Sequence, residues 1–498
     1  MHRGCILIFW AYAACIGPAA ALASEKGDAG KPPTNANEPY SGEGAGLPSS
    51  ERPAPAPKDF EDPAKVWTLP ELLDEALKHN PATTQAWEQA NVAAAQVGVA
   101  KAAYWPTVDL AVAGVASHTG TPNYPGTQEN NQISVTPQLQ IQYLLLDFGA
   151  RKANVEQNRF NLLSQNFTFN KSLQAVTLAV MSAYYNLDGA KAAVKNAESA
   201  LALSEASLRS TEIKLKAGLG TSTDEAQAKQ SVEQSKFNLE SARGALSTAE
   251  IQMAGSLGLP GNTKLEVAPP SNAPSLAVLE EEVDKLIDLA FKQRPDLASK
   301  YNAWRSKLAA VDQAEANRWP ALTVGANLQR SYYQADVSGG NKNFNGSGHD
   351  DGASVNLTFG FGLFDGGGRD YQVKAARHAA EAAKADLAAS ELGVISDVVS
   401  NFVAFKTSAK QVDAAQALLE ASQKSYDSIQ ISYRSGLKNL IDLLTAQSNL
   451  ALAQSSLSQA RSGLFTASAN LANATGSVMT TASVQQSAST GTAADPAR

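Results

Sequence analysis

Side chains of the kinds that usually carry out catalysis or bind metals are few in this sequence and lie far apart. Histidine ligands on a helix must stand three or four residues apart, because only such side chains share a face. No two of the five histidines have that spacing, so we interpret them as surface residues. The sequence therefore predicts no enzyme, no metal site and no cofactor. The histidines are His2, His79, His118, His349 and His378.

A glycine-rich segment, Asp365-Gly366-Gly367-Gly368-Arg369, has the composition of a loop that holds phosphate. It lacks the Gly-Lys-Ser/Thr ending with which a P-loop binds phosphate and Mg²⁺. It also stands between an expected strand and a long expected helix. We interpret it as the connector between these two elements.

Length and charge limit the possible partners. The chain has 498 residues, which is room for two or three ordinary domains. Its formal net charge is −7, from 41 basic and 48 acidic residues. Proteins that bind nucleic acid usually carry a basic patch, so we expect no nucleic-acid partner.

Residues 1–23 have the pattern of a secretory signal peptide. A weakly positive start precedes an apolar run that begins at residues 6–11, and Ala21-Leu22-Ala23 offers a cleavage site. Cys15 allows a second interpretation, a lipidated cysteine, although Tyr12 is a poor residue three positions before one. Cleavage after Ala23 would remove both cysteines of the chain and leave no thiol for disulfides or metal binding.

Two segments have the composition of disordered chain. Residues 24–66 are rich in Pro, Gly and Ala, and residues 477–498 in Ser, Thr and Ala, so both have too little to bury. Between them we expect no membrane-spanning helix, because no run of about 18 apolar residues follows the signal. An exported chain of this kind stays soluble in the periplasm, is secreted, or crosses the outer membrane as β-strands.

The chain between these segments contains one large unit twice. Tyr104-Trp105-Pro106 and Arg318-Trp319-Pro320 stand 214 residues apart, whereas Asp147-Phe148-Gly149 and Asp365-Gly366-Gly367 stand 218 apart. Chance matches would not keep one register on each side of a single four-residue insertion. We expect a first repeat at 67–265, a second at 266–476, and the insertion in the loop or strands of the second hairpin.

Each repeat begins with a helical stretch, about 68–103 and about 280–317, and continues into two segments of alternating apolar and polar residues. Such alternation fits the half-buried sheet of a soluble domain and equally the wall of a transmembrane barrel with a wet lumen. Pro137 cannot donate a ladder hydrogen bond and predicts a bulge or a strand end. The alternating apolar residues are Val108, Leu110, Val112, Ile133, Val135, Leu139, Ile141, Tyr143, Leu322, Val324, Ala326, Leu328, Val355, Leu357, Phe359, Phe361 and Leu363.

Two very long helices, each followed by a break and a shorter helix, complete the repeats. Residues 150–215 contain no proline and would span on the order of 100 Å as one helix. Breaks are expected at 217–220 and at Ser435-Gly436, with the helix after the first break at 224–256. Heptad spacing in both shorter helices predicts antiparallel coiled-coil hairpins. The heptad residues are Glu225, Val232, Leu239, Leu246 and Met253, and then Leu443, Leu450, Leu457, Leu464 and Leu471.

Over residues 66–476 this plan resembles the TolC family of outer-membrane efflux proteins. The specific motifs are the two Trp-Pro pairs, the strand exits at 146–149 and 363–367, and the two helix breaks at 215–224 and 433–442. The resemblance implies an α+β membrane protein with an internal duplication. It further implies a homotrimer, in which each subunit gives four strands to one 12-stranded outer-membrane barrel and four helical arms to a coiled-coil periplasmic tunnel.

The resemblance also implies a gate at the periplasmic end of the tunnel. Carried over onto matching positions, Tyr433 and Lys438 would hold the closed state, with Asp224 and Thr223 as partners. Asp442 would supply three carboxylates facing a narrow pore, and such a ring favours cations. The alternative interpretation of Asp442 is a solvated carboxylate on the face of its helix.

Two residues of the expected gate depart from the family pattern. Thr445 stands where the best-known members have a second aspartate. Lys438 stands where they have an arginine, and lysine cannot form a bidentate pair with a carboxylate. These departures predict a less acidic and more loosely latched constriction.

The resulting hypothesis is an outer-membrane channel-tunnel subunit that passively conducts small molecules or secreted proteins. With no nucleotide or proton site, it would depend on an inner-membrane pump, joined through a periplasmic adaptor, and its barrel would contact outer-membrane lipid. The alternatives are a coiled-coil cell-surface structural or adhesin protein, and a plugged barrel acting as a receptor. Multidrug efflux, metal efflux and type I secretion all remain open as the process that the channel serves.

Overall fold

The computed structural model describes residues 60, 65–123, 126–270, 282–339 and 343–478. The expected signal peptide, with Cys5 and Cys15, lies outside the described residues, as do nearly all of the expected leader (24–66) and tail (477–498). Both expected repeats lie largely within them.

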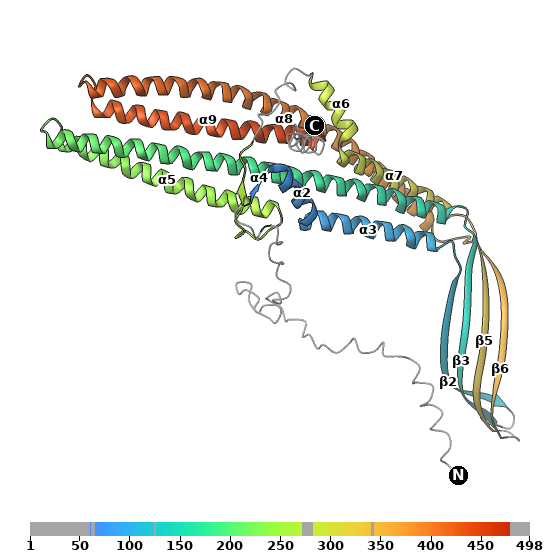
Figure 1. Cartoon of the computed structure of the whole chain (residues 1–498). Helices are drawn as coiled ribbons and strands as arrows, with labels where there is room; N and C mark the ends of the chain where they lie inside the picture. Colours follow the sequence, from blue (N-terminus) through green and yellow to red (C-terminus); the bar gives the residue numbers. More distant parts are fainter. Residues whose placement is uncertain (1–59, 61–64, 124–125, 271–281, 340–342, 479–498) are drawn as a thin grey trace, which may run out of the picture. The chain divides into compact units, whose positions relative to one another are not determined.

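The described chain consists of two successive sets of helices and strands with the same order (Figure 1). In each set, two short helices lead into a β-hairpin, which is followed by a 67-residue helix and a 35-residue helix. The first set is α2 (Leu69–His79), α3 (Pro81–Ala102), β2 (Thr107–Asn123), β3 (Gly126–Leu146), α4 (Ala150–Lys216) and α5 (Ser222–Ser256). The second is α6 (Val283–Gln293), α7 (Pro295–Ala316), β5 (Ala321–Ser338), β6 (Phe344–Gly360), α8 (Gly368–Arg434) and α9 (Leu440–Ala474).

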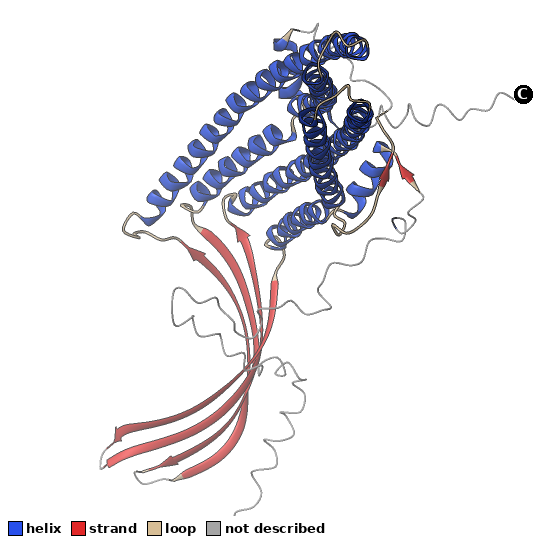
Figure 2. Cartoon of the chain, turned by 90° about the vertical axis from the view of Figure 1, so that its left-hand side faces the viewer, coloured by secondary structure: helices blue, strands red, loops and turns tan. Residues whose placement is uncertain are grey.

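The two β-hairpins form one antiparallel sheet (Figure 2), with the strand order β2-β3-β5-β6 (Figure 1). Alternation places the expected apolar residues on one face, where Leu110, Leu139 and Leu328 lie opposite one another. Within the described residues, β2 and β6 have no strand on their outer sides, so both edges of the sheet are open. A separate pair of short parallel strands, β1 (Val66–Trp67) and β4 (Glu266–Val267), lies beside the helices.

Strand pairing confirms the duplication and locates the insertion. The paired arms begin at Thr107↔Gln142 and at Ala321↔Gly360, positions that are offset by 214 on the first strand and by 218 on the second. The last pairs are Asn123↔Gly126 and Val337↔Phe344. Two residues separate Asn123 from Gly126 in the first hairpin, and six separate Val337 from Phe344 in the second. The four extra residues therefore lie in the second hairpin loop, as expected.

The interpretation of Pro137 as a bulge or strand end is wrong. β3 continues through Pro137, which lies opposite Val112, and the register on β5 is the same before and after it. The ladder to β5 simply skips two positions, and the hydroxyl of Thr136 donates to that of Ser331 at 3.0 Å instead. The irregularity in β3 lies further on, between Leu144 and Leu146.

Two other expected boundaries also need correction. The helical stretches at 68–103 and 280–317 are each two helices, because Pro81 and Pro295 begin new helices and force an extended conformation on the residue before them. Phe361 and Leu363, expected in the last strand, lie beyond its end at Gly360.

The long helices pair as expected. α5 packs along α4, and α9 along α8. All five leucines of the second heptad series are buried, and so are Val232, Leu239 and Met253 of the first. The two hairpins contact each other mainly through α4 and α9.

The expectation that no helix has the composition of a membrane span is wrong for α8. Among the described helices, α8 alone is long and apolar enough to cross a membrane by length and composition, although little of its apolar stretch is buried in this chain. Leu392 and Val403 on α8 are exposed, whereas Asp397 on the same helix pairs with Arg294 at 3.3 Å. An alanine-rich helix with one face against its own chain and one face uncovered explains this composition.

Four glycines with positive φ allow a matched test of these helix ends. Gly476 follows α9 with φ 79°, and a Cβ there would lie 2.9 Å from the carbonyl carbon of Gln293, whereas Gly436 after α8 has φ 77° and open space around it. We expect Gly436→Ala to cost about 1–2 kcal/mol for backbone strain alone. Gly476→Ala should cost about 2–4 kcal/mol, because overpacking is added.

Chemical unfolding followed by the helical circular dichroism signal would measure both costs. The first repeat supplies the same pair, with Gly258 packed against Pro81 and Gly218 in open space. Equal costs at Gly436 and Gly476 would contradict the close packing of Gly476 against Gln293.

Candidate functional site

The expected gate residues lie at the far ends of the two helical hairpins, where α4 turns into α5 and α8 into α9. Both turns use the same backbone device. Gly218 and Gly436 take positive φ, and the next residue donates back to the preceding helix, from Leu219 to Lys214 O and from Leu437 to Ser432 O, each at 2.9 Å. This is the Schellman ending of a helix, and it makes each turn short and rigid.

Asp224 and Asp442 occupy equivalent positions, 218 residues apart, at the start of α5 and α9. Each is the third residue of its helix and the last residue of a capping box. The carboxylate of Asp224 accepts from the backbone and hydroxyl of Thr221 at 3.0 and 2.8 Å. The backbone N–H of Asp442 donates to the Asn439 side chain at 2.8 Å, and its carboxylate accepts weakly from Asn439 N at 3.4 Å. Both aspartates therefore secure the helix start.

Asp442 also has a cationic neighbour. Lys438 Nζ lies 3.5 Å from Asp442 Oδ2, with about half of the lysine side chain and a third of the aspartate side chain exposed. Exposed pairs of this kind contribute little to stability. Lys438 therefore partly neutralises Asp442 without fixing it in place.

Tyr433 contacts a residue that sequence reasoning missed. The Tyr433 side chain is buried, and Lys214 Nζ lies 3.6 Å from the centre of its ring. The same ammonium group lies 3.5 Å from the Tyr433 carbonyl oxygen. Lys214 stands in the last turn of α4 and Tyr433 in the last turn of α8, so this cation–π contact joins the two helical hairpins near their ends.

The expected partnership of Tyr433 and Lys438 with Asp224 and Thr223 does not occur within one chain. Asp224 binds Thr221, and Thr223 is exposed in the first turn of α5. No hydrogen bond or ion pair among the described residues joins either of them to Tyr433 or Lys438. The signal that could have identified Lys214 is its place as a cation in the last turn of a helix, where the helix dipole favours it.

The same ends expose apolar side chains in matching positions. Ile213 and Ile431 are each 68% exposed, and Leu219 and Leu437 each 81% exposed. The two ends therefore present the same pattern of exposed aliphatic side chains to their surroundings.

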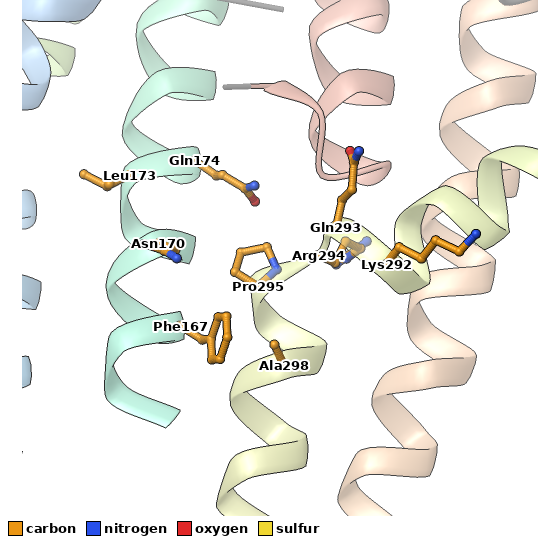
Figure 3. Close-up of a pocket in the computed structure, with 9 residues that line it drawn as sticks. All are labelled: Phe167, Asn170, Leu173, Gln174, Lys292, Gln293, Arg294, Pro295 and Ala298. Atoms are coloured by element: carbon orange, nitrogen blue, oxygen red, sulfur yellow. The ribbon is translucent and has the colours of Figure 1, made fainter. Parts of the chain in front are cut away.

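A second cluster of polar residues lies where α6 meets α7 and packs against α4 (Figure 3). Phe167, Asn170 and Gln174 of α4 face Arg294 and Pro295 across a small half-open cavity. Arg294 donates to both carboxylate oxygens of Asp296, at 3.0 and 2.6 Å, and to Asp397 and the Ala474 carbonyl, each at 3.3 Å. It thereby joins the junction to α8 and to the end of α9.

The first repeat has a neutral version of this junction. Asn80 donates to the Ser256 carbonyl at 2.9 Å, and Ser256 is the counterpart of Ala474. The Asn80 oxygen also caps α3 by accepting from Ala82 N at 2.9 Å. Both repeats thus tie the short-helix junction to the end of the 35-residue helix.

The described residues include no group of three or more His, Cys, Asp or Glu that could hold a metal ion, and the residues that line the cavity beside Arg294 do not form a metal site.

The pKa values of two aspartates among the helices are shifted in opposite directions. Burial of Asp296 opposes its ionisation, but the Arg294 guanidinium and the Leu297 N–H outweigh that effect and hold its pKa below the ordinary value. Burial raises the pKa of Asp188 on α4, and Lys191 offsets this only in part.

Comparison with known proteins agrees with this architecture. The family described as outer membrane efflux protein matches residues 72–259 and 286–477. CyaE of Bordetella pertussis is 27% identical over 407 residues, which cover 82% of this chain and 83% of that protein. Escherichia coli TolC is 21% identical over 78% of each chain.

Solved structures share the fold. The outer-membrane channel OprN superposes with a TM-score of 0.71 at 19% identity, covering 84% of this chain and 91% of that chain. The Campylobacter jejuni CmeC outer-membrane channel has the same TM-score and identity, over 84% of this chain and 87% of that one.

The two shifted aspartates predict opposite changes of stability with pH. Asp296 has a lowered folded pKa, so its contribution is present above its unfolded pKa of about 3.9 and is lost as pH falls through the folded value. Asp296→Asn should therefore lower the free energy of unfolding by about 1.5–3 kcal/mol at pH 7 and by much less near pH 3.

Asp188→Asn is the matched variant of opposite sign. Its folded pKa is raised, so its contribution is present below the unfolded pKa and is lost as pH rises through the folded value. Relative to wild type, this substitution should raise the free energy of unfolding at pH 7 and have a smaller effect at pH 3. Unfolding curves between pH 3 and 7 measure both, and parallel pH profiles for the two variants would disprove the assignment.

Proposed function

Because the chain belongs to the outer membrane efflux protein family and is an outer-membrane efflux channel, we propose that three copies assemble into one barrel and one tunnel. The observation that carries the proposal is the four-stranded sheet, which has two open edges and runs directly into the long helices. Unpaired backbone groups at such edges cannot be left in hydrocarbon. Four strands cannot close on themselves, whereas twelve enclose a water-filled lumen.

The helices support the same assembly. The uncovered apolar side of α8, with Leu392 and Val403 exposed, supplies a surface that a neighbouring copy would bury. The α4–α5 and α8–α9 hairpins of three copies would then form a closed ring of helices around a periplasmic tunnel. Burial of aliphatic side chains in such contacts contributes about 25 cal/mol per Å².

The proposed partners rest on family membership and on what the hairpin ends expose. Family membership makes it a transport protein, and we propose that it supplies a passive path for small molecules or secreted proteins while an inner-membrane pump supplies the energy. The exposed Ile213, Leu219, Ile431 and Leu437 would bind a periplasmic adaptor that joins channel and pump.

The gate we propose lies at these hairpin ends. Three copies of Asp442 would surround the narrowest opening and favour cations, since they bring three carboxylates to one axis. Lys438 at 3.5 Å from each carboxylate would weaken that preference. Tyr433, held by Lys214 within its own subunit, would resist the outward movement of the α8–α9 hairpin. Asp224 and Thr223, which have no bond to this group within one chain, would reach the neighbouring subunit.

Single-channel recording in a planar bilayer tests the acidic ring. Asp442→Asn keeps an oxygen acceptor at the capping position but removes the charge, so the cation-to-anion permeability ratio should fall towards one. Asn439→Ala breaks the same capping box without changing the charge and should cost about 1 kcal/mol of stability while leaving selectivity unchanged. Selectivity that survives Asp442→Asn would place the ring elsewhere, and a complete lack of conductance in wild type would refute the channel.

A second recording tests the contact between Lys214 and Tyr433. Lys214→Gln removes a cation–π contact of about 0.5–2 kcal/mol per subunit, so the open fraction should rise several-fold. Lys216→Gln removes an equal charge from an exposed position two residues away and should leave gating unchanged. The same open fraction in both variants would show that the contact does not restrain opening.

A further inference from the structure

One ion pair lies on the apolar face of the sheet. Along β5, the residues of this face are Leu322, Val324, Ala326 and Leu328, and the next in the alternation is Arg330. Its cross-strand partner on β6 is Asp351. Towards the hairpin loop, Asp351 is the next residue of this face after Val355 and Ala353. No other ion pair joins two strands in the described part of the sheet.

The pair has the geometry of a bidentate contact. Arg330 Nη2 donates to Asp351 Oδ2 at 2.8 Å, and Arg330 Nε donates to Asp351 Oδ1. About half of each side chain remains exposed. A guanidinium has five N–H donors. Asp351 accepts from two of them and the Tyr332 side chain is a further partner, so the N–H groups that remain face whatever surrounds the sheet.

The character of the face changes at this pair. On β5 and β6 the rows before it are apolar, and the rows after it contain first Tyr332 and His349 and then Gln334 and Ser347. A charge on the lipid face of a barrel is costly at the midplane and nearly free of cost at the interface. Aromatic side chains gather at that interface. The order of rows is therefore that of a hydrocarbon layer ending at Arg330 and Asp351.

The length of apolar strand agrees. Residues 321–330 of β5 and 351–360 of β6 are ten residues each, and a tilted strand needs about 9–11 to cross the hydrocarbon layer. At the other end of β5 stands Trp319, 62% exposed, and before β2 stands Trp105, 75% exposed. These tryptophans fit the opposite interface.

The boundary is slanted across the sheet, as strand tilt requires. On β2 and β3 the aliphatic rows continue to Ala116↔Ile133, which is four residues beyond the row of Val112 and Pro137 that adjoins Arg330. Four residues along a strand cover about 13 Å, and three strand spacings cover about 14 Å. If the boundary of the hydrocarbon layer is level in the membrane, this offset between the strands corresponds to a strand tilt of about 45°. Strands of membrane barrels are tilted by about 35–45°.

We propose that the Arg330–Asp351 pair lies at the outer rim of the hydrocarbon layer, where Arg330 donates its free N–H groups to the phosphates of lipid headgroups. This proposal rests on the proposed function, since it requires the sheet to be a membrane barrel wall. Asp351 makes the pair neutral and keeps the guanidinium close to the apolar rows. The free edge of the guanidinium matches phosphate oxygens in charge and planar geometry.

The depth of spin labels tests the position of the rim. Single cysteines at Val324, Leu328, Tyr332 and Asp336 lie on the same face of β5, in a background with Cys5 and Cys15 replaced by serine. In phosphatidylcholine vesicles, the labels at Val324 and Leu328 should be accessible to oxygen, and those at Tyr332 and Asp336 to a water-soluble nickel complex. A label at Gln329, on the opposite face, should report water.

The two possible failures are distinguishable. If every label reports water, the membrane barrel itself is refuted. If the labels at Tyr332 and Asp336 are as accessible to oxygen as that at Leu328, the barrel stands and the rim at Arg330 is refuted.

Variants test whether the pair sets the rim. Arg330→Leu with Asp351→Leu adds one aliphatic row and should move the Tyr332 label into the oxygen-accessible layer. The exchanged pair, Arg330→Asp with Asp351→Arg, should keep the wild-type profile, and so should Gln329→Leu on the other face. An unmoved Tyr332 label in the double-leucine variant would overturn the role of the pair.

Solid-state NMR tests the occupant of the free edge. Dephasing of arginine Cζ by lipid ³¹P should be present in wild type in phosphatidylcholine vesicles and reduced in Arg330→Gln. Arg377→Gln, which removes an arginine from helix α8, should leave it unchanged. Dephasing that does not fall in Arg330→Gln would show that no phosphate binds there.

Discussion

The structure depends on one constraint, that a β-sheet with open edges and an apolar face cannot exist alone in lipid. In this chain β2 and β6 leave both edges of a four-stranded sheet unpaired, and one face is aliphatic over several rows. Every backbone N–H and C=O at those edges needs a partner in hydrocarbon. The described residues supply none, so in the assembly proposed above other copies would complete the sheet, and the helices that continue the strands would follow the same symmetry.

Duplication provides a common backbone, on which the two repeats have acquired different side chains. Both helix turns use the Schellman ending, and both following helices begin with a capping box ending in aspartate. At the short-helix junction, however, the neutral Asn80 of the first repeat corresponds to the charged Arg294 of the second. Likewise Tyr433 and Lys214 have no aromatic or cationic counterparts, since Leu215 and Ser432 occupy those positions. Differences of this kind give the two helical hairpins different contacts on the same backbone.

Much of the fold could be predicted because it depends on local periodicity. Alternation over the strands gave their faces, and heptad leucines gave the buried side of α9. The errors came where local rules had two outcomes. Pro137 suggested a bulge, but a strand tolerates proline when a neighbouring side-chain contact replaces the lost ladder bond, as Thr136 and Ser331 show. The helix breaks before Pro81 and Pro295 have a local cause, because proline disfavours helix in the residue before it, yet the helical composition on both sides of each proline predicts one continuous helix.

By itself, the sequence determined the duplication, the strand faces, the helical hairpins and the membership of a channel family, because each is written in spacing along the chain. Only the tertiary structure decided which side chains far apart in the sequence meet. Lys214 lies against Tyr433, Arg294 reaches Asp397 and Ala474, and Arg330 pairs with Asp351. These contacts join residues from 21 to 219 positions apart. Strand register and helix packing set such distances, and no local pattern encodes them.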